Sequence, residues 1–115
     1  MKKVRSKALR AAIQGMPCSL RIASFAGQQC APDETVVGCH LPTPEKGMST
    51  KSSDLAIVAG CATCHDMLDG RNPLGLKAKA KFPGAYHQQL LFALTETQAR
   101  LVEKGIINVK GDEND

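Results

Sequence analysis

The chain has 115 residues, of which 43% are hydrophobic and only 3% aromatic, and its formal net charge is +4. This length favours a single domain that buries about 60–65% of its unfolded surface, so the core is thin and a structural metal would add needed stability. No run approaches the ~20 apolar residues of a membrane span, which predicts a soluble protein.

Positive charge is concentrated in two stretches of the chain, whereas the tail 111–115 is acidic. Such stretches suit a polyanionic partner such as nucleic acid, although a solvated surface gives the same composition. The basic residues concerned are Lys2, Lys3, Arg5, Lys7 and Arg10, followed later by Arg71, Lys77, Lys79 and Lys81.

The first half of the chain predicts a basic arm and an extended region. We expect residues 1–15 to form the arm, with a short helix over 6–12, and residues 16–110 to form one domain. Within residues 18–41, polar and apolar residues alternate early, and a β-branched run follows the turn signal Pro32-Asp33. This region therefore predicts a hairpin. Residues 42–53 are rich in proline and hydroxyl side chains, which predicts a mobile surface loop.

The second half reads mainly as helix. A short apolar strand over 55–59 leads into a helix that begins near Cys61 and ends at Gly70. A break at 71–73 precedes a helix over about 86–104, and residues 106–109 add a final strand. Five residues of the last helix form an apolar stripe that we assign to the core: Leu90, Leu91, Leu94, Leu101 and Val102.

The string Cys61-Ala62-Thr63-Cys64-His65 places two thiols and an imidazole within five residues. A C-x-x-C-H string marks either c-type haem attachment or the zinc-stabilised end of a small nuclease site. Haem attachment requires export, but Arg10 and Gln14 interrupt the apolar run that a signal peptide needs. No methionine lies beyond the motif helix to serve as an axial ligand. The string therefore favours a metal site.

Five cysteines without a signal peptide indicate reduced thiols in the cytoplasm of a bacterial cell rather than a disulfide scaffold. Cys18 and Cys30 upstream, with Cys61 and Cys64 downstream, would make a closed tetrahedral zinc site and leave Cys39 outside it. Two alternatives stay open. Cys18 and Cys30 could simply be small buried hydrophobes, or a histidine could replace one of them as a ligand.

A hairpin whose end carries a histidine, a loop and a helix that opens with C-x-x-C-H resemble the ββα-metal, or HNH, nucleases. Residues 5–110 more closely resemble the YbcO-like nucleases of lambdoid phages and prophages. The most specific part is Cys-x-x-Cys-His-Asp-x-x-Asp-Gly-Arg, which runs over 61–71. The other matching segments are Arg5 to Arg10, Cys18 to Ile22, Cys30, Cys39 to Leu41, Lys51 to Leu55, and Thr97-Gln98 with Gly105-Ile106.

The resemblance implies a small α+β domain of ββα-metal type, with a structural zinc and an additional C-terminal helix. It also implies an endonuclease that hydrolyses phosphodiester bonds, with DNA favoured over RNA. Two positions depart from the HNH pattern. Cys39 stands where a metal-binding residue usually precedes the general base, and Asp54 stands where an asparagine is usual.

Four side chains are candidates for the hydrolytic chemistry. His40 is the best general base, because an imidazole titrates near neutral pH. His65 would hold a divalent ion, magnesium or manganese or zinc, with Asp69 one turn further on as its co-ligand or orienting partner. Arg71 could reach a phosphate with two N–H groups.

Each assignment has a simpler alternative. His40 could be a surface histidine, Asp69 and Arg71 could form only an ion pair, and His65 could complete the zinc site. His87 is expected to be a surface or capping residue. At the level of function, the alternatives are a non-catalytic zinc-dependent nucleic-acid-binding module, which needs neither His40 nor His65, and an adaptor within a phage replication or recombination assembly.

Overall fold

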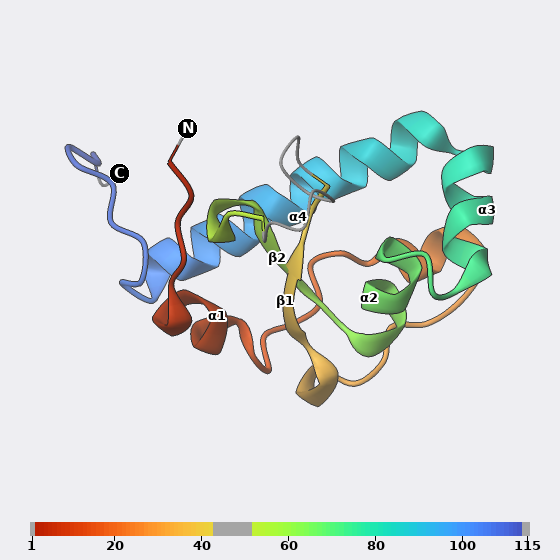
Figure 1. Cartoon of the computed structure of the whole chain (residues 1–115), viewed down its shortest axis with the longest axis horizontal. Coiled ribbons are helices and arrows are strands. Elements are labelled where there is room, and N and C mark those ends of the chain that lie inside the picture. Colours follow the sequence, from red (N-terminus) through yellow and green to blue (C-terminus); the bar gives the residue numbers. More distant parts are fainter. Residues whose placement is uncertain (1, 43–51, 114–115) are drawn as a thin grey trace.

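Two short strands form the sheet of the computed structural model, which describes residues 2–42 and 52–113 (Figure 1). Strand β1 (Val37–His40) pairs antiparallel with β2 (Ile57–Gly60), so that His40 lies opposite Ile57. The remaining elements are helices α1 (Lys7–Ile13), α2 (Ala62–Leu68), α3 (Pro73–Lys81) and α4 (Pro83–Glu103), with 3-10 turns η1 (Ile22–Ala26), η2 (Asp33–Thr35) and η3 (Asp54–Ala56). The chain is therefore a small α+β domain.

The expected hairpin within residues 18–41 is wrong, because β1 pairs with a strand that lies beyond this region. The N–H groups of Ser19 and Leu20 both donate to the carbonyl of Ala59, after which the chain turns into η1. Leu20 and Ile22 are both fully buried. Their alternation with polar residues therefore reflects a buried turn that docks on β2, and not a strand of its own.

Helix α1 confirms the helix expected over 6–12, and α2 confirms the one expected from Cys61. Helix α3 was not predicted, because Asn72-Pro73 was interpreted as a break. The pair instead starts a helix: the Asn72 side chain accepts a hydrogen bond from the Leu74 N–H at 3.0 Å, and proline occupies the first helical position. Helix α4 consequently begins at Pro83, earlier than expected.

The strand expected over 106–109 is also wrong, because Ile106 and Ile107 donate their N–H groups to the carbonyl of Leu101 and close the end of α4. Of the predicted leucine stripe, Leu90 and Leu101 are buried but Leu91 is 61% exposed. Figure 1 shows α4 passing behind the sheet, with α1 near its C-terminal end and α3 near its start. The buried face of α4 is Tyr86, Leu90, Ala93, Thr97 and Leu101.

No helix within 2–42 and 52–113 is both long and apolar enough to cross a membrane. The loop expected over 42–53 falls mostly on residues 43–51, which lie outside the described residues.

Helices α2 and α3 pack closely at Gly75. A Cβ atom placed there would lie 2.8 Å from the backbone Cα of Met67, and backbone cannot move aside easily. We expect Gly75→Ala to lower the free energy of unfolding by about 1–3 kcal/mol. Gly84→Ala is the matched control: nothing lies within 4 Å of its added Cβ, so this change should be neutral or slightly stabilising. Urea unfolding of both variants tests this, and an unchanged midpoint for Gly75→Ala would contradict the close packing.

Candidate metal centre and histidine sites

Four cysteines from three separate segments meet beside the first turn of α2. Cys18 precedes η1, Cys30 follows it, and Cys61 and Cys64 flank the start of the helix. Their four Sγ atoms all lie within 4.8 Å of one another, and no other group of three or more possible His, Cys, Asp or Glu ligands is found among the described residues. The Cys30 and Cys64 sulfurs are 3.8 Å apart.

This spacing fits a metal that is bound by four sulfurs. A tetrahedron with metal–sulfur bonds of about 2.3 Å has sulfur–sulfur edges of about 3.8 Å. A disulfide would instead require about 2.05 Å, and none of the five cysteines is in a disulfide. The predicted ligand set, Cys18, Cys30, Cys61 and Cys64, is therefore brought together as a candidate metal centre.

Backbone N–H groups point at two of the sulfurs. Cys18 Sγ accepts from the N–H of Arg21 at 3.5 Å and from that of Cys61 at 3.3 Å, and Cys61 Sγ accepts from the N–H of Cys64 at 3.4 Å. Two of these bonds, from Arg21 to Cys18 and from Cys64 to Cys61, have the N–H donor three residues after the cysteine. Arg21 adopts a left-handed conformation, with φ of 44°, to make its bond. Such donors stabilise sulfur in the thiolate form that binds metals.

The four thiols also influence one another's protonation. The hydrogen bond from Cys64, helped by backbone N–H groups, outweighs burial and lowers the pKa of Cys18 to about 5. Cys30 is exposed as a residue, but its sulfur faces the cluster, and removal from water there raises its pKa to about 12. The hydrogen bond to Cys18, followed by burial, raises the pKa of Cys64. Four thiolates at this spacing therefore need a cation between them.

Cys39 lies outside this cluster. It is only 1% exposed on β1, and its thiol donates to the carbonyl of Val37 at 3.5 Å. In the HNH pattern a metal-binding residue usually stands at this position. Its burial in the core instead gives Cys39 a packing role.

His40 lies at the end of β1 and is bonded to a buried carboxylate. Its Nε2 is 2.8 Å from Oδ1 of Asp54, whose side chain is fully buried, whereas the His40 side chain is 25% exposed. Asp54 also accepts bonds from the backbone N–H of Ser6 at 2.7 Å, from Arg10 at 2.6 Å and from Arg5 at 3.2 Å. His40 is thus held firmly, unlike an ordinary surface histidine.

Asp54 stays ionised in this setting. Burial alone would raise the pKa of its carboxyl group, but the hydrogen bonds from Ser6, His40 and Arg10 and the charge of Arg5 together hold that pKa below its usual value. The carboxylate therefore acts as an acceptor for all of these donors.

The other predicted residues form a second group on and after α2. His65 Nε2 lies 3.1 Å from Oδ2 of Asp69, and Nη2 of Arg71 lies 3.2 Å from the same oxygen. Arg71 also contacts Asp66 at 3.0 Å. The ion pair between Asp69 and Arg71 is thus present, and His65 is bonded to Asp69 rather than to the cysteine cluster. The structure therefore brings His65, Asp69 and Arg71 together, whereas His40 lies in a separate group with Asp54.

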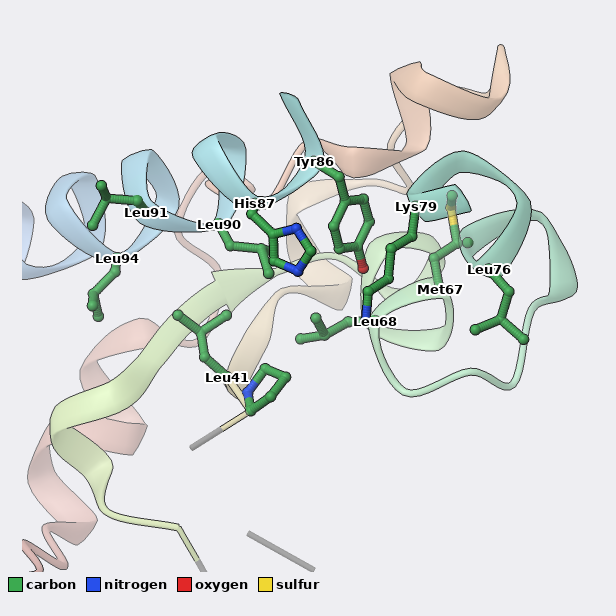
Figure 2. A pocket seen from close by; sticks show the side chains of 12 residues that line it. Leu41, Met67, Leu68, Leu76, Lys79, Tyr86, His87, Leu90, Leu91 and Leu94 are labelled. Atoms are coloured by element: carbon green, nitrogen blue, oxygen red, sulfur yellow. The ribbon is translucent and has the colours of Figure 1, made fainter. Parts of the chain in front are cut away.

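His87 lies four residues into α4 and lines a separate pocket. Its Nδ1 lies 2.7 Å from the carbonyl of Pro83, one turn earlier in the same helix, and the residue is exposed, so His87 is a surface residue and does not cap α4. A pocket of about 440 Å³ lies between α2, α3 and α4. Figure 2 shows Tyr86, His87 and Lys79 facing Leu68 in this pocket. Its remaining lining is mainly leucine, methionine and proline.

The cluster of Arg5, Arg10 and Asp54 around His40 was missed by sequence reasoning. Its members are 44 and 49 residues apart along the chain, and no local spacing connects them. The available signal was the position of Asp54, which matches that of the asparagine in the HNH pattern.

The fold and site define a small α+β domain built around a four-cysteine centre. A family model described as "Putative nuclease YbcO" matches residues 7–105. The chain therefore belongs to this family, which confirms the resemblance seen in the sequence. No curated protein matches the chain, and no solved structure does.

Proposed function

We propose that the chain is a metal-dependent endonuclease that hydrolyses phosphodiester bonds of nucleic acid, with DNA favoured over RNA. The observation that carries this proposal is the bond between His40 and the buried, ionised Asp54 in a chain of this family. A partly exposed imidazole held by a carboxylate is suited to accept a proton from water.

Asp54 determines that Nε2 of His40 carries a proton. An ionised carboxylate can only accept, so Nε2 of His40 carries a proton that it donates to Asp54. The imidazole held in this way is the proposed proton acceptor as water attacks the phosphorus. Asp54 is a positioning residue for this base and takes the place of the usual asparagine.

His65 and Asp69 are the proposed holders of a catalytic divalent ion, magnesium or manganese. Neighbouring ligands of an octahedral ion with bonds of about 2.1 Å are about 3.0 Å apart, and His65 Nε2 and Asp69 Oδ2 are separated by 3.1 Å. When bound, the ion would stabilise negative charge that develops on the phosphate oxygens. Arg71, which contacts Asp69 at 3.2 Å and Asp66 through Nε and Nη2, could offer its Nη1 to the same phosphate.

Zinc is the proposed occupant of the four-cysteine centre. Four thiolates in a tetrahedron are the donor set of structural zinc, and a closed shell of protein ligands leaves no position for substrate. Two of the sulfurs, those of Cys61 and Cys64, belong to residues with no exposed surface. We therefore assign zinc to stability and the catalytic ion to the second group.

The test is nicking of supercoiled plasmid by the purified chain, with and without added magnesium or manganese. We expect nicking that depends on the added ion while the zinc content stays constant, since the two metals occupy different sites. A chain that binds nucleic acid but cuts neither DNA nor RNA with any divalent ion would contradict the nuclease proposal. The non-catalytic binding module or adaptor would then take its place.

A further inference from the structure

Arg5 and Arg10 converge on Asp54 from the N-terminal region. Arg5 donates from Nη1 to Oδ1 and to the carbonyl of Ser52, and Arg10 donates from Nη1 to Oδ2. The chain before α1 is fixed here as well, because the N–H of Val4 donates to the Ser53 side chain and Val4 accepts from the N–H of Asp54. Both guanidinium groups therefore have defined positions.

This arrangement contains more positive charge than the buried carboxylate requires. One arginine would neutralise Asp54, and the second leaves a net positive charge beside the partly exposed ring of His40. The Arg5 and Arg10 side chains are 38% and 36% exposed. Within residues 2–42 and 52–113, only Nη1 of each guanidinium makes hydrogen bonds, so Nε and Nη2 have no described protein partner.

We propose that Arg5 and Arg10 form a binding site for a backbone phosphate of the nucleic-acid strand whose phosphodiester bond lies at His40. This inference rests on the proposed function and adds its substrate-binding element. The edge formed by Nε and Nη2 matches two phosphate oxygens, and arginine binds phosphate in this paired way. Because Asp54 already orders both side chains, little rotamer freedom remains to be lost on binding.

The site lies next to the proposed base because both share one carboxylate. Arg5 Nη1 and His40 Nε2 bond to the same oxygen, Oδ1, and Arg10 bonds to the other. Arg5, Arg10 and His40 therefore surround one carboxylate, and we place the bound phosphate at this group.

The experiment measures binding of a fluorescent oligonucleotide to the full chain over a range of salt concentrations, without added divalent ion. DNA and RNA of the same sequence are used in separate arms. The variants are Arg5→Gln and Arg10→Gln, and the matched control is Lys110→Gln, which removes one exposed charge after α4. Each arginine variant should weaken binding about tenfold at low salt. It should also reduce the slope of log K against log salt by about 0.7–0.9, as expected when one phosphate contact is lost.

Stability is controlled within the same set of variants. Thermal unfolding and zinc content are measured for each, because losing a partner of Asp54 affects the fold. Arg10→Lys keeps the charge but not the paired geometry, so its slope should stay near that of the parent chain while its affinity falls. Arg5→Gln carries the test if Arg10→Gln does not fold, since the Arg5 bond to Asp54 is the longer of the two at 3.2 Å.

Slopes and affinities of folded arginine variants that equal those of Lys110→Gln would overturn the phosphate site. Plasmid cleavage measured in parallel separates this result from a failure of the proposed function. If the parent chain cuts and the arginine variants bind normally, only the phosphate site is wrong. If the parent chain does not cut but the slopes fall as expected, the phosphate site stands and the nuclease assignment is wrong.

Discussion

Cys30→Ala is expected to abolish stoichiometric zinc binding and to unfold the chain at room temperature. Structural zinc contributes about 10–16 kcal/mol of apparent binding energy, which equals or exceeds the entire stability of a typical domain. Cys30 is the informative ligand because it is exposed. Without a metal, truncating an exposed side chain changes stability by only about 0.5 kcal/mol. Elemental analysis and thermal unfolding by circular dichroism provide the two measurements.

Cys39→Ala is the control for the loss of a cysteine. This residue is buried on β1 but lies outside the four-sulfur group, so the variant should lose about 1–2 kcal/mol of packing and retain one zinc per chain. The zinc proposal would fail if the parent chain were purified without metal and kept its circular dichroism spectrum and melting temperature. It would fail equally if Cys30→Ala behaved like Cys39→Ala.

The four-cysteine cluster was predictable because half of its members are local. Cys61 and Cys64 lie on one helical turn, and the sequence also indicated that helix α2 begins there. The two upstream cysteines do not share one local turn as Cys61 and Cys64 do. Cys18 forms its own turn with the N–H of Arg21, whose left-handed backbone no sequence pattern indicated, and Cys30 reaches the cluster after η1.

The wrong predictions concern pairing between distant segments and one helix start that was interpreted as a break. Polar and apolar residues alternate over 19–22, and this pattern is the same in a strand and in a buried turn. Only the hydrogen bonds to Ala59 show that the segment is a buried turn. The pair Asn72-Pro73 can end one helix or start the next, and here it starts α3, because α2 has already ended at Leu68. Asp54, the partner of His40, lies 14 residues further along the chain, and the arginines that hold Asp54 come from the N-terminal region, so no local spacing connects the base with this group.

His40→Ala is expected to lower plasmid cleavage by about 10²–10⁴-fold while zinc content remains at one per chain, because a general base contributes mainly to rate. The structure adds a cost that the sequence did not indicate. The variant removes one hydrogen bond to Asp54, so we expect a loss of about 1 kcal/mol in stability. Asp54 keeps its bonds from Ser6, Arg10 and Arg5, which prevents a buried unpaired charge.

A second substitution separates catalysis from this structural contact. His40→Gln offers an amide N–H to Asp54 but cannot accept a proton near neutral pH, so it should fold like the parent chain and remain as inactive as His40→Ala. His87→Ala removes the exposed histidine at the start of α4 and should cut at the parent rate. Cleavage by folded His40→Gln at the parent rate would show that His40 is held by Asp54 for stability alone. The water would then need a different proton acceptor.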